Sequence, residues 1–208
     1  MSVQPVRTPN ANLVPSGHPA RVHPNNTNPG SSGGLVAEND AAAWLAQLGF
    51  DVVQSPTVAN GPVTRSDMVS LGLRADADPD KLVNGLVFDT YSPTSPSARN
   101  IHANIRDNKL GTGQTRRVIV NISDSTVDPT ALLEQFADWP MTANFNGVEV
   151  AMEEAIFLRN GQVVGHWVPE LSPATISGAP VALQFCGPGS AIDLVSGHCD
   201  EEELSHGN

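Results

Sequence analysis

Three acidic residues occupy positions from which they could converge on one divalent cation. Glu38 lies in the first turn of an expected helix, Asp80 opens an expected hairpin, and Asp89 ends the second strand of that hairpin. A hard cation such as Mg²⁺ prefers oxygen ligands, and it can polarise a phosphodiester and lower the pKa of an attacking water. The pattern therefore indicates metal-assisted chemistry on a phosphate ester. Structural explanations are also open: Glu38 could complement a helix dipole, Asp80 could be a turn residue, and Asp89 could simply end a strand.

The cations of the chain gather in one span. Residues 99–117 hold five of its eleven Lys and Arg residues against one acid, Asp107. One interpretation is a phosphate-facing strip beside the carboxylates, and the other is an ordinary solvated helix face. Lys109 is one of only two lysines, and we expect it to stabilise a pentavalent phosphate or to orient the water. The remaining four are candidate nucleic-acid-binding residues: Arg99, Arg106, Arg116 and Arg117.

Composition limits the classes of protein to which the chain can belong. Its 208 residues and 39% hydrophobic content fit one domain of ordinary size. A net charge of −11 argues against a general nucleic-acid coat, because phosphate binding depends on clustered cations. No run of about 18 apolar residues occurs, so no stable membrane insertion is expected. The N-terminus also lacks the apolar core of a Sec signal peptide.

The pattern of apolar residues predicts the elements that must position these side chains. The expected order is a helix (35–48), a strand (50–54), a hairpin turning at Asn84-Gly85, a helix (99–110), a strand (117–122), a helix after Asp128-Pro129, and a hairpin turning at Asn160-Gly161. Alternation of this kind predicts an α/β core with a mixed sheet flanked by helices.

The two ends of the chain differ from this patterned middle. Residues 1–34 are rich in Pro, Gly and Asn and contain no acid, so we expect a flexible linker. Residues 171–208 contain five acids and no Lys or Arg, so we expect an irregular acidic tail. Both extensions are expected to be disordered, and residues 35–170 are expected to form the folded domain.

Five segments in sequence carry a resemblance to a known family. They read AENDAAAWLAQLGFDVVQSP, PDKLVNGLVFDTYSP, ARNI, GQTRRVIVNISDS and LLEQFADWPM. Over about residues 35–170 the chain resembles the C-terminal tRNase toxin domain of CdiA-type contact-dependent growth inhibition effectors and related bacterial polymorphic toxins. The resemblance implies a PD-(D/E)xK nuclease-like core that uses a divalent metal, with Mg²⁺ expected, to cut tRNA.

The resemblance also implies roles for individual residues. The helix glutamate of the family falls on Glu38, the aspartate of its PD element on Asp80, and its second acid on Asp89. All three would be metal ligands and catalytic residues. The standard motif places a lysine two residues after Asp89, where this chain has Tyr91. Lys109 is the candidate substitute from the following helix.

Partners and location follow from the same resemblance. We expect a tRNA substrate, a cognate immunity protein, and secretion or delivery into the cytoplasm of a target cell. One alternative is a catalytically degenerate RNA- or protein-binding module of the same fold, which the absence of a lysine after Asp89 favours. Another alternative is an unrelated metal-dependent enzyme that acts on a small phosphorylated molecule.

Overall fold

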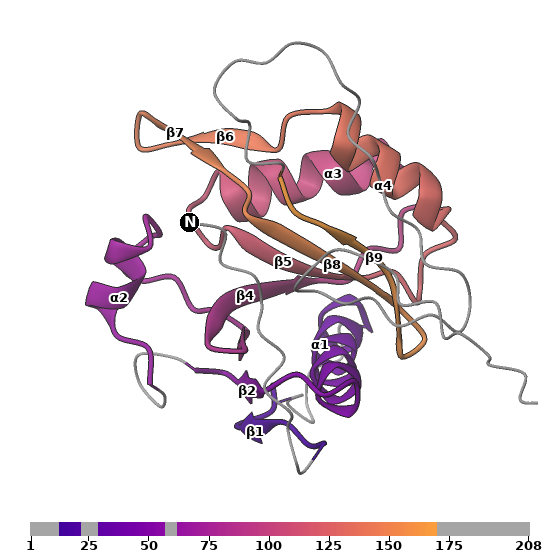
Figure 1. The fold of residues 1–208 in the computed structure, drawn as a ribbon, viewed down its shortest axis with the longest axis horizontal. Coiled ribbons are helices and arrows are strands. Elements are labelled where there is room, and N and C mark those ends of the chain that lie inside the picture. Colours follow the sequence, from indigo (N-terminus) through magenta and orange to yellow (C-terminus); the bar gives the residue numbers. More distant parts are fainter. Residues whose placement is uncertain (1–12, 22–28, 57–61, 170–208) are drawn as a thin grey trace, which may run out of the picture. The chain divides into compact units, whose positions relative to one another are not determined.

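A mixed sheet of seven strands forms the centre of the computed structural model, which describes residues 13–21, 29–56 and 62–169 (Figure 1). In their order across the sheet the strands are β1 (Ser16–Gly17), β2 (Val52–Gln54), β3 (Lys81–Val83), β4 (Leu86–Tyr91), β5 (Arg117–Asn121), β8 (Glu154–Arg159) and β9 (Gln162–Trp167). The pairs β1–β2, β4–β5 and β5–β8 are parallel, and the other three pairs are antiparallel. A separate hairpin is formed by β6 (Thr142–Phe145) and β7 (Val148–Ala151).

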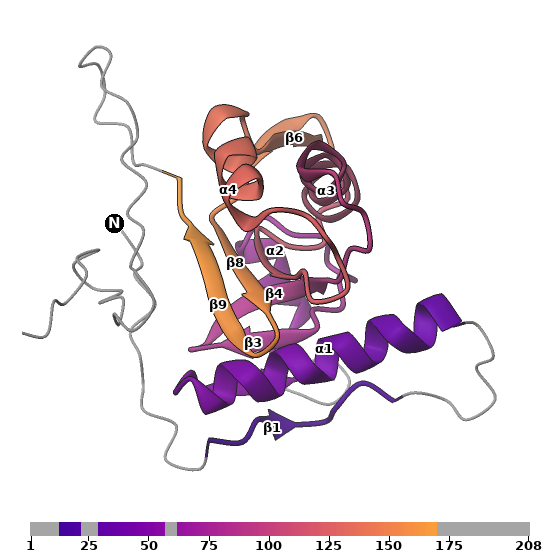
Figure 2. The ribbon, with the colours of Figure 1, turned by 90° about the vertical axis from the view of Figure 1, so that its right-hand side faces the viewer.

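Helices cover both faces of this sheet. They are α1 (Pro29–Gln47), α2 (Arg65–Ser70), α3 (Ala98–Ile105), a π-helical turn η1 (Arg106–Leu110) and α4 (Pro129–Asp138). Figure 2 shows α1 on one side of the strands and α3 with α4 on the other. The predicted mixed α/β architecture, with a sheet flanked by helices, is therefore confirmed. None of the helices in the described part of the chain is long and apolar enough to span a bilayer.

Successive side chains of strand β5 point to opposite faces of the sheet. Val118 and Val120 of β5 belong to the core cluster that includes Ile101 of α3 and Phe136 of α4. Asn121 points the opposite way and donates its Nδ2 hydrogen to the Ala37 carbonyl of α1, at 3.1 Å. The two faces of β5 therefore look toward different helices, as the twofold period of a strand requires.

Because β4 pairs with β5, the residues of β4 can be assigned to the same two faces. Asp89 pairs with Val118 and therefore lies on the face that carries α3 and η1. Thr90 pairs with Ile119 and lies on the face that carries α1. Two consecutive residues of β4 consequently serve opposite sides of the sheet.

The β3–β4 hairpin turns where the sequence predicts it. Asn84 and Gly85 have φ angles of +50° and +77°, as a two-residue hairpin turn requires. The Asn84 side chain also accepts a hydrogen bond from the Asp51 amide at 2.9 Å. The turn sets the register of β3 against β4, and with it the positions of the acidic residues at the other end of the hairpin.

Regular structure begins earlier than expected, so the prediction of a linker through residue 34 is wrong in part. Helix α1 starts at Pro29, a residue type that suits the first turn of a helix. Strand β1 also lies in that span, and Asn39 of α1 holds its flanking segment by exchanging two hydrogen bonds with Ala20. The expectations for residues 1–12, 22–28 and 171–208 lie outside the described residues.

Two further differences concern elements that the residue pattern did not resolve. The hairpin β6–β7 was not predicted, although Asn146-Gly147 turns it with positive φ angles. The helix expected over residues 99–110 is divided into α3 and η1. A π-helical turn changes the direction in which its side chains leave the helix, and such turns are frequent at functional sites.

Candidate functional site

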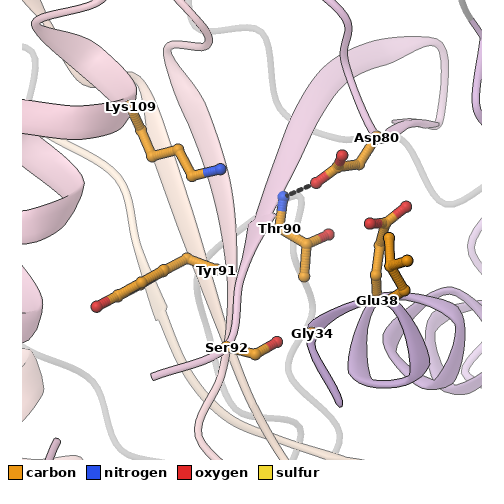
Figure 3. A pocket seen from close by; sticks show the side chains of 8 residues that line it. Gly34, Glu38, Asp80, Thr90, Tyr91, Ser92 and Lys109 are labelled. Carbon is orange, nitrogen blue, oxygen red and sulfur yellow. Dashed lines mark hydrogen bonds between the residues drawn. The ribbon is translucent and has the colours of Figure 1, made fainter. Parts of the chain in front are cut away.

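Asp80 and Asp89 are neighbours because of the hairpin register. Lys81 pairs with Phe88 and Leu82 with Val87, so the next position of the ladder sets Asp80 opposite Asp89. At this point β3 ends, and the Asp80 side chain takes the hydrogen bond that another strand residue would have made. Its Oδ2 accepts the Thr90 amide hydrogen at 2.6 Å (Figure 3). The two aspartates therefore meet where the edge of β4 becomes free.

A pocket of about 320 Å³ opens at this edge. Figure 3 shows Glu38 rising from α1 toward Asp80, with Lys109 reaching in from the opposite side. Asp89 is 1% exposed and lies next to this lining. The structure thus brings all four predicted catalytic residues to one region. The lining consists of Gly34, Leu35, Glu38, Asp80, Thr90, Tyr91, Ser92 and Lys109.

Lys109 forms an ion pair with Asp89. Its Nζ lies 2.6 Å from Asp89 Oδ2, and the Asp89 side chain is almost fully buried. The lysine is part of η1, so the π-helical turn aims it at β4. Tyr91, which stands at the motif position two residues after Asp89, points away from Asp80 and Glu38 in Figure 3. The ammonium near Asp89 thus comes from the helix that follows the strand.

The carboxyl groups crowd one another in a partly dehydrated space. The pKa of Glu38 is raised from 4.5 to about 7, chiefly by burial and then by the charge of Asp80, while the charges of Lys81 and Lys109 oppose the rise. Burial also raises the pKa of Asp89, and hydrogen bonding to the Asp80 carboxyl adds to the effect. Lys109 opposes the rise at Asp89. Burial is therefore the main reason that Glu38 and Asp89 keep their protons to a higher pH than free carboxyl groups do.

Two polar residues at the site, Lys81 and Thr90, were missed by the sequence analysis. Lys81 is 0% exposed, and its Nζ donates to Thr90 Oγ1 at 2.6 Å and to the Glu38 carbonyl oxygen at 3.2 Å. Burial lowers the pKa of Lys81, and the charges of Asp80, Glu38 and Asp89 oppose this effect. One signal was present in the sequence: Lys81 is one of only two lysines and directly follows Asp80. Both lysines of the chain therefore lie at this site.

The arrangement of the carboxylates bears on whether a metal ion fits. Within residues 13–21, 29–56 and 62–169, no three His, Cys, Asp or Glu side chains are arranged to hold a metal ion. Asp80 and Asp89 are nevertheless adjacent, because the register of the hairpin sets them opposite each other. Mg²⁺ commonly takes one or two carboxylates together with substrate phosphates and water. The aspartate pair offers two carboxylates, and Glu38 lines the same pocket as Asp80.

The arginines of residues 99–117 have unequal access to solvent. Arg99 is exposed, and Arg106 is paired with Asp107 at 2.8 Å on the surface. Arg116 and Arg117 both pair with Glu153, at 3.1 and 2.5 Å. The exposed fraction of the side chain is 41% for Arg106, 32% for Arg116 and 12% for Arg117. Among these three arginines, the guanidinium group of Arg117 is therefore the least accessible to a phosphate.

Comparisons with known proteins identify similar sequences and a similar fold. Residues 77–156, which include Asp80, Asp89 and Lys109, match the family model of the contact-dependent growth inhibition CdiA C-terminal domain. The chain is 34% identical over 137 residues to the tRNA nuclease CdiA-2 of Burkholderia pseudomallei (strain 1026b); the match spans 65% of this chain but only 4% of that protein. A solved CdiA-CT/CdiI toxin and immunity complex from Burkholderia pseudomallei is similar with a TM-score of 0.58 and 30% identity, over 74% of this chain and 98% of that chain.

Proposed function

Because the chain belongs to the family of CdiA C-terminal domains of contact-dependent growth inhibition, we propose that it is a toxin endoribonuclease that hydrolyses phosphodiester bonds of tRNA. The name of the relative, tRNA nuclease CdiA-2, supports the choice of substrate. The observation that carries the proposal is the contact of Lys109 with Asp89 beside Asp80 and Glu38, at one open pocket.

We assign the core to the PD-(D/E)xK type of nuclease, with one displacement. Pro79-Asp80 supplies the first acid, Asp89 supplies the second, and Lys109 replaces the lysine that would stand at residue 91. The short distance between Lys109 Nζ and Asp89 Oδ2 supports this assignment, because the motif requires an ammonium beside the second acid. The motif needs an ammonium group beside the second acid, and in this proposal Lys109 of the π-helical turn η1 provides it.

Each residue then has a chemical task. Asp80 and Asp89 would hold one divalent cation, Mg²⁺ in our proposal, and Glu38 would face the water or phosphate next to it. When bound, the cation would polarise the phosphate and lower the pKa of water. Lys109 would place positive charge where negative charge develops on the phosphate. Glu38, whose pKa is raised to about 7, would accept a proton from the attacking water.

The RNA itself would be held by cations outside the pocket. Arg99, Arg106 and Arg116 are the accessible candidates for phosphate contacts, and Arg117 would contribute less because it is mostly buried in ion pairs. The chain carries a net charge of −11, so these contacts must act locally. We therefore expect binding that weakens steeply with salt.

Partner and location follow from family membership. The similar solved structure is a complex of a toxin with an immunity protein, so we propose that a cognate immunity protein binds and blocks this chain. We also propose that the domain is delivered into the cytoplasm of a target cell, where tRNA is accessible.

A catalytically degenerate binding module is the competing proposal. Its main support was the absence of a lysine two residues after Asp89. Lys109 reaches Asp89 from elsewhere in the chain, so that support is weakened.

Incubation with total tRNA in Mg²⁺, with and without chelator, tests the proposal directly. Wild-type protein should yield discrete tRNA fragments, and Asp89→Asn should yield none while it keeps its circular dichroism spectrum. Asp138→Asn, at the exposed end of α4, is the matched control and should cleave like the wild type. Binding of tRNA by the wild type without any cleavage would favour the degenerate module instead.

A further inference from the structure

Thr90 stands between the two halves of the site. Its amide hydrogen goes to Asp80 Oδ2 at 2.6 Å, and its Oγ1 receives a hydrogen bond from Lys81 Nζ at 2.6 Å. The side chain also lines the pocket and lies close to Glu38 in Figure 3. One residue therefore connects a buried lysine to the open space where the proposed substrate would sit.

The contacts of Lys81 determine how the Thr90 hydroxyl is used. Lys81 Nζ donates to two neutral oxygens, Thr90 Oγ1 and the Glu38 carbonyl. It forms no ion pair with a carboxylate among the residues that the structure describes. Since a lysine with its proton has only donors, the Thr90 oxygen must act as the acceptor, and its own hydrogen remains free to donate. A neutral amine still has two N–H groups, which are enough for the same two contacts.

Burial of Lys81 costs free energy of folding, which suggests that the arrangement serves a function. A fully buried lysine loses its hydration, and an apolar side chain of similar length would fill the same volume more cheaply. Among the described residues the Thr90 hydroxyl accepts from Lys81 but donates no hydrogen bond, and the pocket that Thr90 lines is where its hydrogen can find an acceptor. A phosphate oxygen, which accepts hydrogen bonds strongly and carries charge, is the natural partner beside Lys109.

We propose that Thr90 donates a hydrogen bond to a phosphate oxygen of the RNA and that Lys81 is the positioning residue that fixes this donor. The substrate in this statement rests on the proposed function, but the phosphate contact does not require cleavage. Lys81 has a second effect through the Glu38 carbonyl, because it ties the turn of α1 that bears Glu38 to the same strand. The lysine thus connects the Thr90 hydroxyl to the backbone of Glu38.

Two threonine variants test the contact. Thr90→Val removes the hydroxyl with little change of shape, and Thr90→Ser keeps the hydroxyl. Binding of inorganic phosphate, followed by nuclear magnetic resonance titration, should weaken about tenfold or more in Thr90→Val, as for the loss of a hydrogen bond to a charged group. Thr90→Ser should restore binding. Thr126→Val, which alters an exposed threonine elsewhere, should bind phosphate like the wild type.

Cleavage supplies the second measurement. In Thr90→Val the kcat for tRNA should fall about 100-fold, as when one donor to a developing negative charge is removed, and Thr90→Ser should recover it. Lys81→Met should lower phosphate affinity in the same direction, because the hydroxyl then rotates freely. A purely structural role of Lys81 would lower thermal stability and leave phosphate affinity unchanged.

The outcomes separate this inference from the proposed function. Wild-type protein that binds phosphate through Thr90 but cleaves no tRNA would overturn the nuclease proposal and support the contact. Cleavage by the wild type with equal phosphate affinity in Thr90→Val would overturn the contact alone. Failure of Thr90→Ser to restore binding, or no phosphate binding by the wild type, would also overturn it.

Discussion

Lys109 Nζ contacts Asp89 Oδ2 at 2.6 Å across a separation of twenty residues in the chain. Asp89 points to the face of the sheet that carries α3 and η1, and η1 delivers the lysine to that face. In a strand, the residue two places after Asp89 points to the same face, which explains why a motif lysine would stand there. Here Tyr91 occupies that place, and the helix provides the cation instead.

Removal of the Lys109 charge should impair cleavage more than folding. In Lys109→Met the Asp89 carboxyl loses its cation, and the developing charge on the phosphate loses its partner, so kcat should fall about 100-fold. Lys109 is partly exposed, at 24% of its side chain, so the fold should survive. Single-turnover cleavage of tRNA measures the effect.

The control for this variant removes a positive charge elsewhere. Arg65→Met lies on α2 and does not line the pocket. It should change the rate little once tRNA is saturating. An equal loss of kcat in both variants would mean that general charge, and not the contact with Asp89, is responsible.

A second prediction concerns the turn that follows η1. Gly113 has a φ of +68°, and a Cβ added there would overlap the ring of Phe145 in β6. Gly113→Ala should therefore combine backbone strain with overpacking and lower the free energy of unfolding by about 2–4 kcal/mol. Gly147→Ala has a similar φ of +81° but open space, so it should cost only about 1 kcal/mol. Urea unfolding of both variants measures the difference, and equal losses would contradict the role of Phe145.

Much of the site was predictable because local rules determine it. The Asn84-Gly85 turn fixes a two-residue hairpin, and the hairpin register places Asp80 opposite Asp89. The helix that carries Glu38 buries Ala41 and Leu45, whose spacing of four residues is visible in the sequence. The relative positions of residues in a single hairpin can be predicted without knowing which distant segments pack against it.

Other features depend on tertiary contacts, which a sequence pattern does not contain. The segment that follows β1 is held against the middle of α1 by the side chain of Asn39, whose partner Ala20 lies 19 residues away. Lys81 resembles a strand residue at the surface, yet α1 covers it and makes it the most deeply buried cation of the site. Its importance follows from the packing of a helix onto the sheet.

A third prediction concerns metal binding without reference to activity. If Asp80 and Asp89 hold Mg²⁺, the ion should raise the melting temperature of the wild type, because it binds the folded state only. Asp89→Asn should lose most of this Mg²⁺-dependent increase. Differential scanning calorimetry with and without chelator measures it, and Asp138→Asn is the control, since that residue is exposed on α4. An unchanged increase in Asp89→Asn would exclude Asp89 as a ligand.

The last prediction concerns the dependence of stability on pH. The pKa of Glu38 is raised from 4.5 to about 7, chiefly by burial and then by the charge of Asp80. The folded state therefore keeps a proton that the unfolded state has lost between these two values. Glu38 contributes its full stability below about pH 4.5, and the contribution disappears as the pH rises through about 7.

The variant Glu38→Gln isolates this effect because glutamine does not titrate. Relative to the wild type, its free energy of unfolding should increase as the pH rises from about 5 to about 8, since ionisation of Glu38 then destabilises only the wild type. Urea unfolding in the presence of chelator measures the difference, because a bound cation would lower the pKa of Glu38. Glu134→Gln, at an exposed position of α4, should show no such trend. A constant difference between Glu38→Gln and the wild type over this range would contradict the raised pKa, and with it the assignment of Glu38 as the proton acceptor near neutral pH.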